Sequence, residues 1–181
     1  MMGEREMENN TLYESLLGRR SIRSFKPDPI PSESMEKILK AAKYAPSAMG
    51  MQNRFFTVVQ DQNLLKDIVS ATKKAGGGFV AGHVPFYGAP AAVVVSGPEN
   101  FRFSRENTAC AIMNLMLAAF SFGIGSCYIC SVLPGLRDPQ ILSRLHLPYN
   151  YLPFGSVSLG YPAGKEPQPK RRREDDVFFL R

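Results

Sequence analysis

The stretch that decides the fold is residues 105–132, which read RENTACAIMNLMLAAFSFGIGSCYICSV. Residues 105–122 are apolar on nearly all sides of a helical wheel, which predicts a helix that other parts of the protein enclose. Gly123 and Gly125 end that helix, and residues 127–132 are typical of a strand. A helix covered on most sides is easier to build in a short chain if a second subunit supplies part of the cover, so this stretch also favours a dimer.

Further helices and strands are expected on both sides of this stretch. Thr11 and Glu14 form a capping-box pattern that predicts a short helix over about residues 12–18. Ser32 is expected to cap a second helix, which ends before Pro46. The remaining expected helices cover residues 63–75 and a segment that starts at Asp138, and the remaining expected strands are residues 55–60, 91–96 and 154–159.

Size and composition indicate one domain over residues 1–181. A chain of 181 residues that is 44% hydrophobic can bury one good core but not two ordinary ones. No apolar run approaches the roughly 20 residues of a membrane-spanning helix, and the first residues lack the apolar core of a signal peptide. Three cysteines in apolar surroundings, Cys110, Cys127 and Cys130, suit buried thiols better than a disulfide framework. We therefore expect a cytoplasmic protein that has no membrane partner.

The net charge of +6 comes largely from two short basic stretches, residues 19–26 and 165–173. The first stretch places three guanidinium groups and a hydroxyl close together: Arg19, Arg20, Ser21 and Arg23. Bidentate cationic donors beside a short neutral donor match the needs of a phosphate monoester. The simpler interpretation is a solvated helix C-terminus, where arginine also suits the helix dipole.

Three other interpretations of local patterns are weaker. Cys127 and Cys130 have the spacing of a redox dithiol or half of a zinc site, but a strand would point them to opposite faces and no second pair exists, so we expect no metal. The glycines near Gly123 close a helix, whereas a dinucleotide fingerprint opens one. A nucleic-acid arm at residues 165–173 is disfavoured because three acidic residues follow it at once.

Four motifs in this order resemble the nitroreductase family. The first is Arg19-Arg20-Ser21-Ile22-Arg23 followed by Phe25, and the second is Ala45-Pro46-Ser47-Ala48 with Gln52. The third runs from Ala118 through Gly123-Ile124-Gly125-Ser126-Cys127, and the fourth is Gly160-Tyr161-Pro162 with the basic tail after it. Together they span most of the chain, so their combination is more specific than any one of them.

The resemblance implies an α+β fold of the nitroreductase type, with a central, mainly antiparallel sheet flanked by helices. It also implies a homodimer with an exchanged C-terminal segment, in which residues of about 162–181 dock on the partner. Such an enzyme binds FMN and passes hydride from NADH or NADPH through flavin N5 to a small acceptor, such as a nitroaromatic or a quinone, with ping-pong kinetics. Flavin does the chemistry, so no catalytic side chain is needed. The residues implied to bind the cofactor are Arg19, Arg20, Ser21, Arg23, Pro46, Ser47, Ala48, Met49, Gln52, Ile129, Cys130, Ser131, Lys170 and Arg171.

Two departures from the family pattern leave alternatives open. The second motif of the family usually has Asn and then Gln-Pro-Trp, whereas this chain has Gly50 and then Gln52, Asn53 and Arg54. Cys130 and Ser131 stand where the family usually has Gly or Glu-Gly beside flavin N5, so their backbone N–H groups would have to serve. One alternative is therefore an FMN-binding protein that senses or stores flavin. Another is a basic nucleic-acid-binding module, which would be colourless and bind with steep salt dependence.

Overall fold

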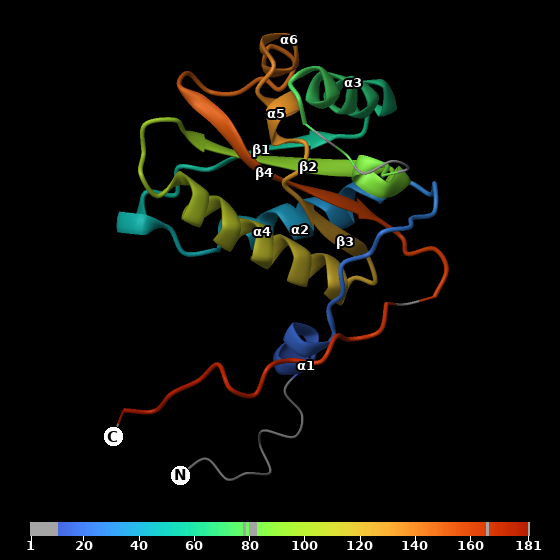
Figure 1. Cartoon of the computed structure of the whole chain (residues 1–181), viewed down its shortest axis with the longest axis vertical. Helices are drawn as coiled ribbons and strands as arrows, with labels where there is room; N and C mark the ends of the chain where they lie inside the picture. The colour runs from blue at the N-terminus through green and yellow to red at the C-terminus, as the bar shows by residue number, and fades with distance from the viewer. Residues whose placement is uncertain (1–10, 78, 80–82, 166, 181) are drawn as a thin grey trace.

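A computed structural model describes residues 11–77, 79, 83–165 and 167–180. Its centre is a four-stranded sheet in the order β1-β2-β4-β3, and each neighbouring pair of strands is antiparallel (Figure 1). The strands are β1 (Phe55–Val59), β2 (Ala91–Pro98), β3 (Gly125–Ile129) and β4 (Tyr151–Gly160). The predicted α+β architecture with an antiparallel sheet is confirmed.

The central strand β2 is buried on both of its faces and separates two hydrophobic cores. Val93 and Val95 belong to one core, and Ala92 and Val94 belong to the other. Successive side chains of a strand point to opposite faces, so this alternation follows directly from the sequence Ala91-Ala92-Val93-Val94-Val95. A strand buried on both faces is apolar without interruption, which is why periodicity alone does not show which face meets which helices.

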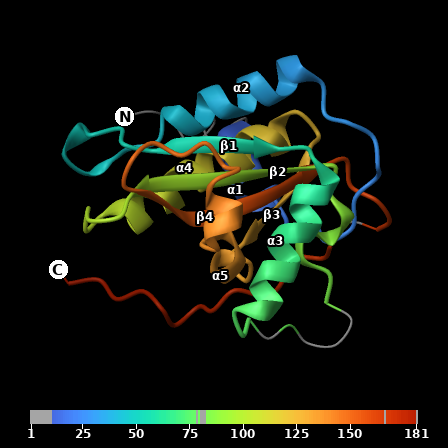
Figure 2. The same ribbon diagram turned by 90° about the horizontal axis from the view of Figure 1, so that it is seen from above.

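Helices cover the two faces of the sheet separately (Figures 1 and 2). Side chains of α2 and α4 form the first core, and side chains of α3, α5 and α6 form the second. The short helix α1 contacts α4 and lies beside the main body. The helices are α1 (Thr11–Gly18), α2 (Ser32–Lys43), α3 (Gln62–Lys74), α4 (Ser104–Ser121), α5 (Leu133–Leu136) and α6 (Pro139–Leu142), with single 3-10 turns η2 (Ala48–Gly50) and η3 (Pro85–Gly88).

Within this chain, helix α4 is covered by the sheet and α2, and α1 contacts it as well, but part of its outer side is exposed. Its buried residues, from Ser104 to Ala119, recur at helical spacing and face the sheet and α2. On its opposite side, Cys110 is exposed, Met113 is 37% exposed, and Phe122 just after the helix is 43% exposed. The described residues of one chain therefore enclose this helix only in part, and the expectation that a second subunit covers the rest stays a prediction.

Several local expectations need correction. Strand β3 ends at Ile129, so Cys130 and Ser131 lie in the turn before α5, whose Pro134 in the first turn favours a helix start there. Ser32 does not cap α2: the N-cap position is Pro31, and no side-chain cap bond forms. Of the three cysteines only Cys127 is buried. Cys110 is exposed because it lies on the outer side of α4, and Cys130 because the strand has ended.

The C-terminal tail runs along the outside of the body and then away from it (Figures 1 and 2). At its end Val177 is 68% exposed and Leu180 is 91% exposed. That this apolar end docks on a partner stays a prediction, since the structure contains one chain.

Candidate functional site

The first basic stretch forms a strap along β3, held at both ends by main-chain contacts. Ser21 makes a parallel bridge to Ser126, and the Ile22 amide donates to the Ser126 carbonyl at 2.9 Å. At the other end, Phe25 makes an antiparallel bridge to Pro162. These contacts fix the backbone of the arginines, so the cluster is a built feature and not a frayed helix end.

A cavity of about 250 Å³ opens between this strap and the passage from α4 to β3. Gly125 makes the close approach of strap and strand possible, because a Cβ atom there would lie 2.8 Å from Ile22 Cγ1 and 3.0 Å from Pro162 Cγ. Gly123, at φ 70°, ends the preceding helix, as the sequence indicated. The residues that line the cavity are Arg19, Arg20, Ile22, Phe120, Gly123, Ile124, Gly125, Ser126, Pro162 and Gly164.

Polar groups of the cavity lining are buried but unpaired. Nε and Nη1 of Arg19 and the Oγ of Ser126 have no hydrogen-bond partner among the described residues. Burial lowers the pKa of the Arg19 guanidinium from its usual value, and the charge of Arg20 lowers it further. Buried donors without acceptors are costly and uncommon in folded proteins. The donor set therefore fits an anionic acceptor such as the phosphate of FMN.

The other arginines of the strap have different surroundings. Arg20 donates through Nη1 to the carbonyls of Leu17 and Arg19, so part of its donor capacity serves the C-terminal end of α1. The guanidinium of Arg23 lies 6.0 Å from the centroid of the Tyr87 ring. Of the three arginines of the strap, Arg19 is therefore the one whose buried donor atoms lack an acceptor among the described residues.

Cys127 lies directly beside this cluster. Burial raises the pKa of its thiol, against the lowering effects of Arg23, of a hydrogen bond from Ser21 and of Arg19. Cationic neighbours thus come from elsewhere in the fold, but burial outweighs them. The thiol stays protonated and weakly nucleophilic near neutral pH.

The basic tail passes near the strap, because the charge of Arg172 is among those that lower the pKa of Arg19. Arg171 pairs with Glu174 at 3.3 Å, and the carbonyl of Lys170 accepts from Arg172 at 3.2 Å. The structure therefore brings the tail to the predicted site. Among its basic residues, Arg172, which the sequence analysis did not single out, interacts electrostatically with Arg19 of the strap.

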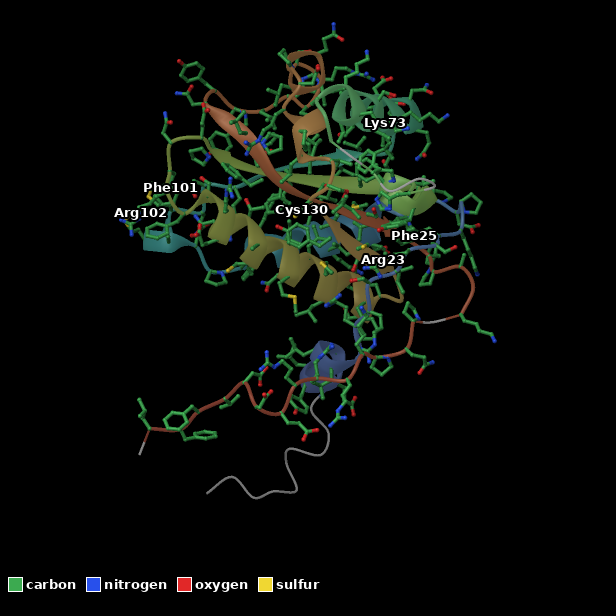
Figure 3. All side chains as sticks on the ribbon, in the orientation of Figure 1. Arg23, Phe25, Lys73, Phe101, Arg102 and Cys130 are labelled. Carbon is green, nitrogen blue, oxygen red and sulfur yellow. The ribbon has the colours of Figure 1, made fainter. Side chains whose placement is uncertain are left out.

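The predicted residues Ile129, Cys130 and Ser131 lie at the end of β3 and in the turn that follows it. Ile129 lies three residues along β3 from the bridge at Ser126, which is about 10 Å at roughly 3.3 Å per residue. Cys130 and Ser131 follow in the turn after the strand (Figure 3). Here Tyr128 lies over Gly155, where a Cβ atom would come within 2.9 Å of its hydroxyl oxygen. Burial, followed by the charge of Cys130 and a hydrogen bond that the Tyr128 hydroxyl donates to Cys130, raises the pKa of Tyr128 to about 12.

The second predicted group lies elsewhere in the chain. Pro46, Ser47, Ala48, Met49 and Gln52 form the loop between α2 and β1, at the opposite end of the sheet from the strap (Figures 1 and 2). Met49 is 75% exposed. One chain therefore does not bring the two predicted groups together.

Three residues that were not selected from the sequence, Ser126, Asn107 and Arg54, line the cavity or hold the α2–β1 loop. Ser126 contributes an unpaired hydroxyl to the cavity, and its place in the third motif was a usable signal. Asn107 and Arg54 hold the α2–β1 loop, and nothing in the sequence alone indicates those long-range contacts. Among the described residues, no group of three His, Cys, Asp or Glu side chains could bind a metal ion, and no helix is both long and apolar enough to cross a membrane.

An antiparallel sheet between two helical layers, with a candidate phosphate cavity beside β3, defines an α+β protein with a candidate site for a phosphate-bearing ligand. The chain belongs to the nitroreductase family, whose model matches residues 16–161.

Individual relatives agree with this placement. The chain is 35% identical over 148 residues to a protein of Archaeoglobus fulgidus that carries the provisional designation NADH dehydrogenase/NAD(P)H nitroreductase, covering 80% of this chain and 81% of the relative. It is 28% identical over 183 residues to the FMN reductase (NADPH) of Bacillus subtilis, covering 90% of this chain and 72% of the relative. The crystal structure of a nitroreductase with bound FMN from Bacteroides fragilis superposes with a TM-score of 0.87 at 30% identity, covering 96% of this chain and 100% of that one. The protein is an oxidoreductase of this family.

Proposed function

We propose that the protein is an FMN-dependent oxidoreductase that takes hydride from NADH or NADPH and passes it to a small acceptor such as a nitroaromatic or a quinone. The observation that carries the proposal is the pair of buried, unpaired Arg19 donors beside the Ser126 hydroxyl. The similarity to a nitroreductase with bound FMN and to an FMN reductase supports the choice of ligand.

The chain's own residues would bind and orient the cofactor. Arg19, Ser21 and Arg23 suit the phosphate, since guanidinium groups form strong bidentate bonds to phosphate oxygens. The backbone N–H groups of Cys130 and Ser131 suit the ring, because a backbone donor keeps its position through both half-reactions. FMN itself supplies the redox chemistry, accepting hydride and giving it up again. Alternate use of one open face of the cofactor by donor and acceptor would give ping-pong kinetics.

A homodimer completes the site in this proposal. The outer side of α4 exposes Met113 and Phe122, and the end of the tail exposes Val177 and Leu180. Apolar surface of this kind on both a helix and a tail suits burial against a second copy. A partner would also supply the Ser47 loop, which one chain keeps away from its own strap. The free cysteines suit the reducing cytoplasm, where we place the protein.

The absorbance spectrum of the purified protein tests this function. We expect a flavin spectrum that bleaches on anaerobic addition of NADH or NADPH and returns when a nitroaromatic or quinone is added. A flavin spectrum that neither nicotinamide bleaches would instead support the alternative of flavin sensing or storage, and a colourless protein that cannot be loaded with FMN would contradict both. Light scattering should give the mass of two chains, and a monomer mass for active, flavin-loaded protein would contradict the dimer.

A further inference from the structure

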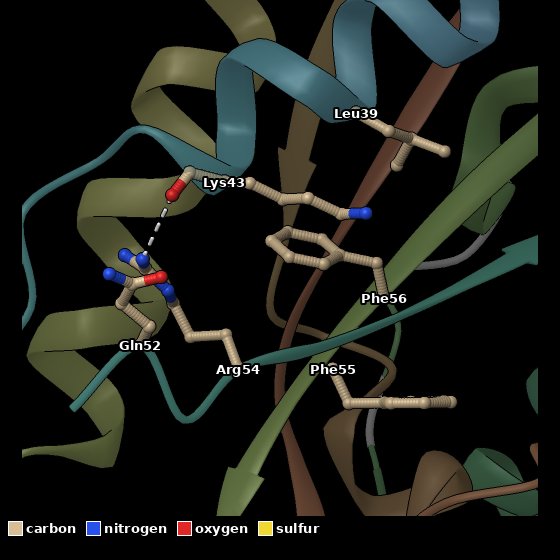
Figure 4. A pocket seen from close by; sticks show the side chains of 6 residues that line it. All are labelled: Leu39, Lys43, Gln52, Arg54, Phe55 and Phe56. Atoms are coloured by element: carbon tan, nitrogen blue, oxygen red, sulfur yellow. Dashed lines mark hydrogen bonds between the residues drawn. The ribbon is translucent and has the colours of Figure 1, made fainter.

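Arg54 ties the start of β1 to the C-terminal end of α2. Its guanidinium donates to three main-chain carbonyls, of Pro46 at 3.0 Å, Ala45 at 3.0 Å and Lys43 at 3.3 Å. The contact with Lys43 is drawn in Figure 4. The last carbonyls of a helix have no partner inside the helix and carry partial negative charge, so a cation with several donors suits them well. Arg54 therefore holds the loop that follows α2 at its base.

Hydrogen bonding is the main constraint on Arg54. Its side chain lines an open cavity of about 380 Å³, together with Leu39 and Phe56 (Figure 4). A side chain that borders open space is not fixed by packing on that side. The three carbonyl contacts thus set the position of the guanidinium, and the guanidinium in turn sets the position of those carbonyls.

Asn107 of α4 holds the same loop from another direction. Its side chain is 3% exposed, its Oδ1 accepts from the Ala48 amide at 2.8 Å, and its Nδ2 donates to Asn53 Oδ1 at 3.1 Å. Breaking either contact would leave a buried polar group unpaired, so both contacts are strongly preferred. Residues 45–54 are therefore anchored from β1 by Arg54 and from α4 by Asn107.

Between these anchors the loop orients Ser47. The Gln52 amide donates to Ser47 Oγ at 2.9 Å, and the Gly50 amide donates to the Ser47 carbonyl at 3.0 Å. Met49 and Gln52 both adopt positive φ, at 54° and 47°, which residues other than glycine keep only where their surroundings impose it. Since Ser47 Oγ already accepts a bond, its one proton is left to donate to a group outside the loop.

We propose that Arg54 and Asn107 are positioning residues that hold Ser47 so that its hydroxyl donates to a carbonyl oxygen of the partner subunit's flavin. The proposal rests on the proposed function, because it needs a flavin at the other end of a dimer. It also accounts for the departure in the second motif: Arg54 stands where the family usually has Trp, and it secures the loop through main-chain carbonyls.

A double-mutant cycle on FMN affinity tests this role. Arg54→Met keeps much of the side-chain length and removes all donors, Ser47→Ala removes the proposed contact, and the third variant combines them. If Arg54 acts through Ser47, each single change should weaken FMN binding about tenfold, as for loss of one hydrogen bond, and the double change should also cost about tenfold. Independent effects would multiply to roughly a hundredfold, and that result would overturn the proposal.

The control is Arg144→Met. Arg144 pairs with Asp61 and Asp67 near α3, on the other face of the sheet, and its loss should leave FMN affinity within about twofold of wild type. Arg54→Lys keeps the charge but not the fork of donors, so its FMN affinity should lie between those of wild type and Arg54→Met. If Arg54→Met does not fold, Arg54→Lys takes its place in the double-mutant cycle.

Hydrogen exchange in the apoprotein gives a readout that needs no flavin. The amides of Ala48 and Gln52 should lose protection in Arg54→Met and keep it in Arg144→Met, because both amides donate within the anchored loop. Unchanged protection of both amides in Arg54→Met would overturn the proposal. A wild-type protein that does not bind FMN would refute the proposed function, whereas wild type and Arg54→Met that bind FMN equally well would refute only the role of Arg54.

Discussion

Replacing Arg19 with Met should weaken FMN binding and stabilise the apoprotein at the same time. In the folded chain, two donor atoms of this guanidinium are buried without an acceptor, which disfavours the folded state when no ligand is present. Methionine keeps the apolar stem and fills much of the same space. The opposite signs of the two effects distinguish a ligand-binding arginine from a structural one.

The sizes of both effects of Arg19→Met can be estimated from the two buried donor atoms, Nε and Nη1. An unpaired buried donor costs about 1–3 kcal/mol, and Arg19 is only partly buried, so we expect the free energy of unfolding of the apoprotein to rise by about 1–2 kcal/mol. A hydrogen bond to a charged group contributes about 1.5–3 kcal/mol, so losing at least one to the phosphate should weaken FMN binding by about 10- to 150-fold.

Two measurements on each variant suffice: urea unfolding of the apoprotein and titration of the apoprotein with FMN. Arg20→Met is the matched comparison, because it removes a cation from the same strap whose Nη1 already has carbonyl partners. It should lower the stability of the apoprotein and weaken FMN binding less than Arg19→Met does. An Arg19→Met apoprotein that is less stable than wild type, or that binds FMN equally well, would show that the cavity is not the phosphate site.

Three further predictions concern other parts of the molecule. Because the pKa of Tyr128 is about 12 in the folded protein and near 10 when unfolded, the folded state holds the proton more tightly, so stability should fall as pH rises from about 10 towards 12. Urea unfolding of Tyr128→Phe should show a weaker fall, and parallel pH curves would contradict this assignment. Thr72→Val should cost about 1–3 kcal/mol, since the buried Gly135 amide loses its 3.2 Å contact with the hydroxyl, whereas Thr72→Ser should cost less; FMN affinity should not change in either. The double variant Cys127→Ser, Cys130→Ser should keep flavin reduction by both nicotinamides, and a loss of a hundredfold or more, about 2.7 kcal/mol of barrier, would make the thiols participants.

The sequence predicted the elements well where one local signal was sufficient. The glycines after α4 and the aspartate before α6 ended and began helices as expected, and Asp138 indeed accepts from the Gln140 amide. The end of β3 was predicted wrongly because Cys130 to Val132 are as apolar as a strand. Their conformation follows from the start of α5, a helix too short to leave a periodic signal.

Within the candidate site, the sequence indicated the arginines but not how they differ. Arg19 and Arg20 are adjacent and identical in type, and only the fold shows that one has partners at the end of α1 while the other has buried atoms without any. The anchors of the Ser47 loop were missed for a related reason. Asn107 is distant from that loop in sequence, and a polar residue on an apolar helix does not indicate which segment it meets.

Because side chains alternate along β2, neighbouring residues of this one strand pack into different hydrophobic cores. A change in side-chain volume at Val93 or Val95 is felt by α2 and α4, the helices that carry the anchored loop and the exposed apolar side. A change at Val94 is felt by α3, α5 and α6 and by Ile129 at the end of β3, which is one of the residues predicted to bind the cofactor. Substitutions on the odd-numbered side of β2 would therefore bear on the anchored loop and on assembly, and substitutions on the even-numbered side on the end of β3 near the proposed ring contacts. Neighbouring residues of one strand would then report on separate properties.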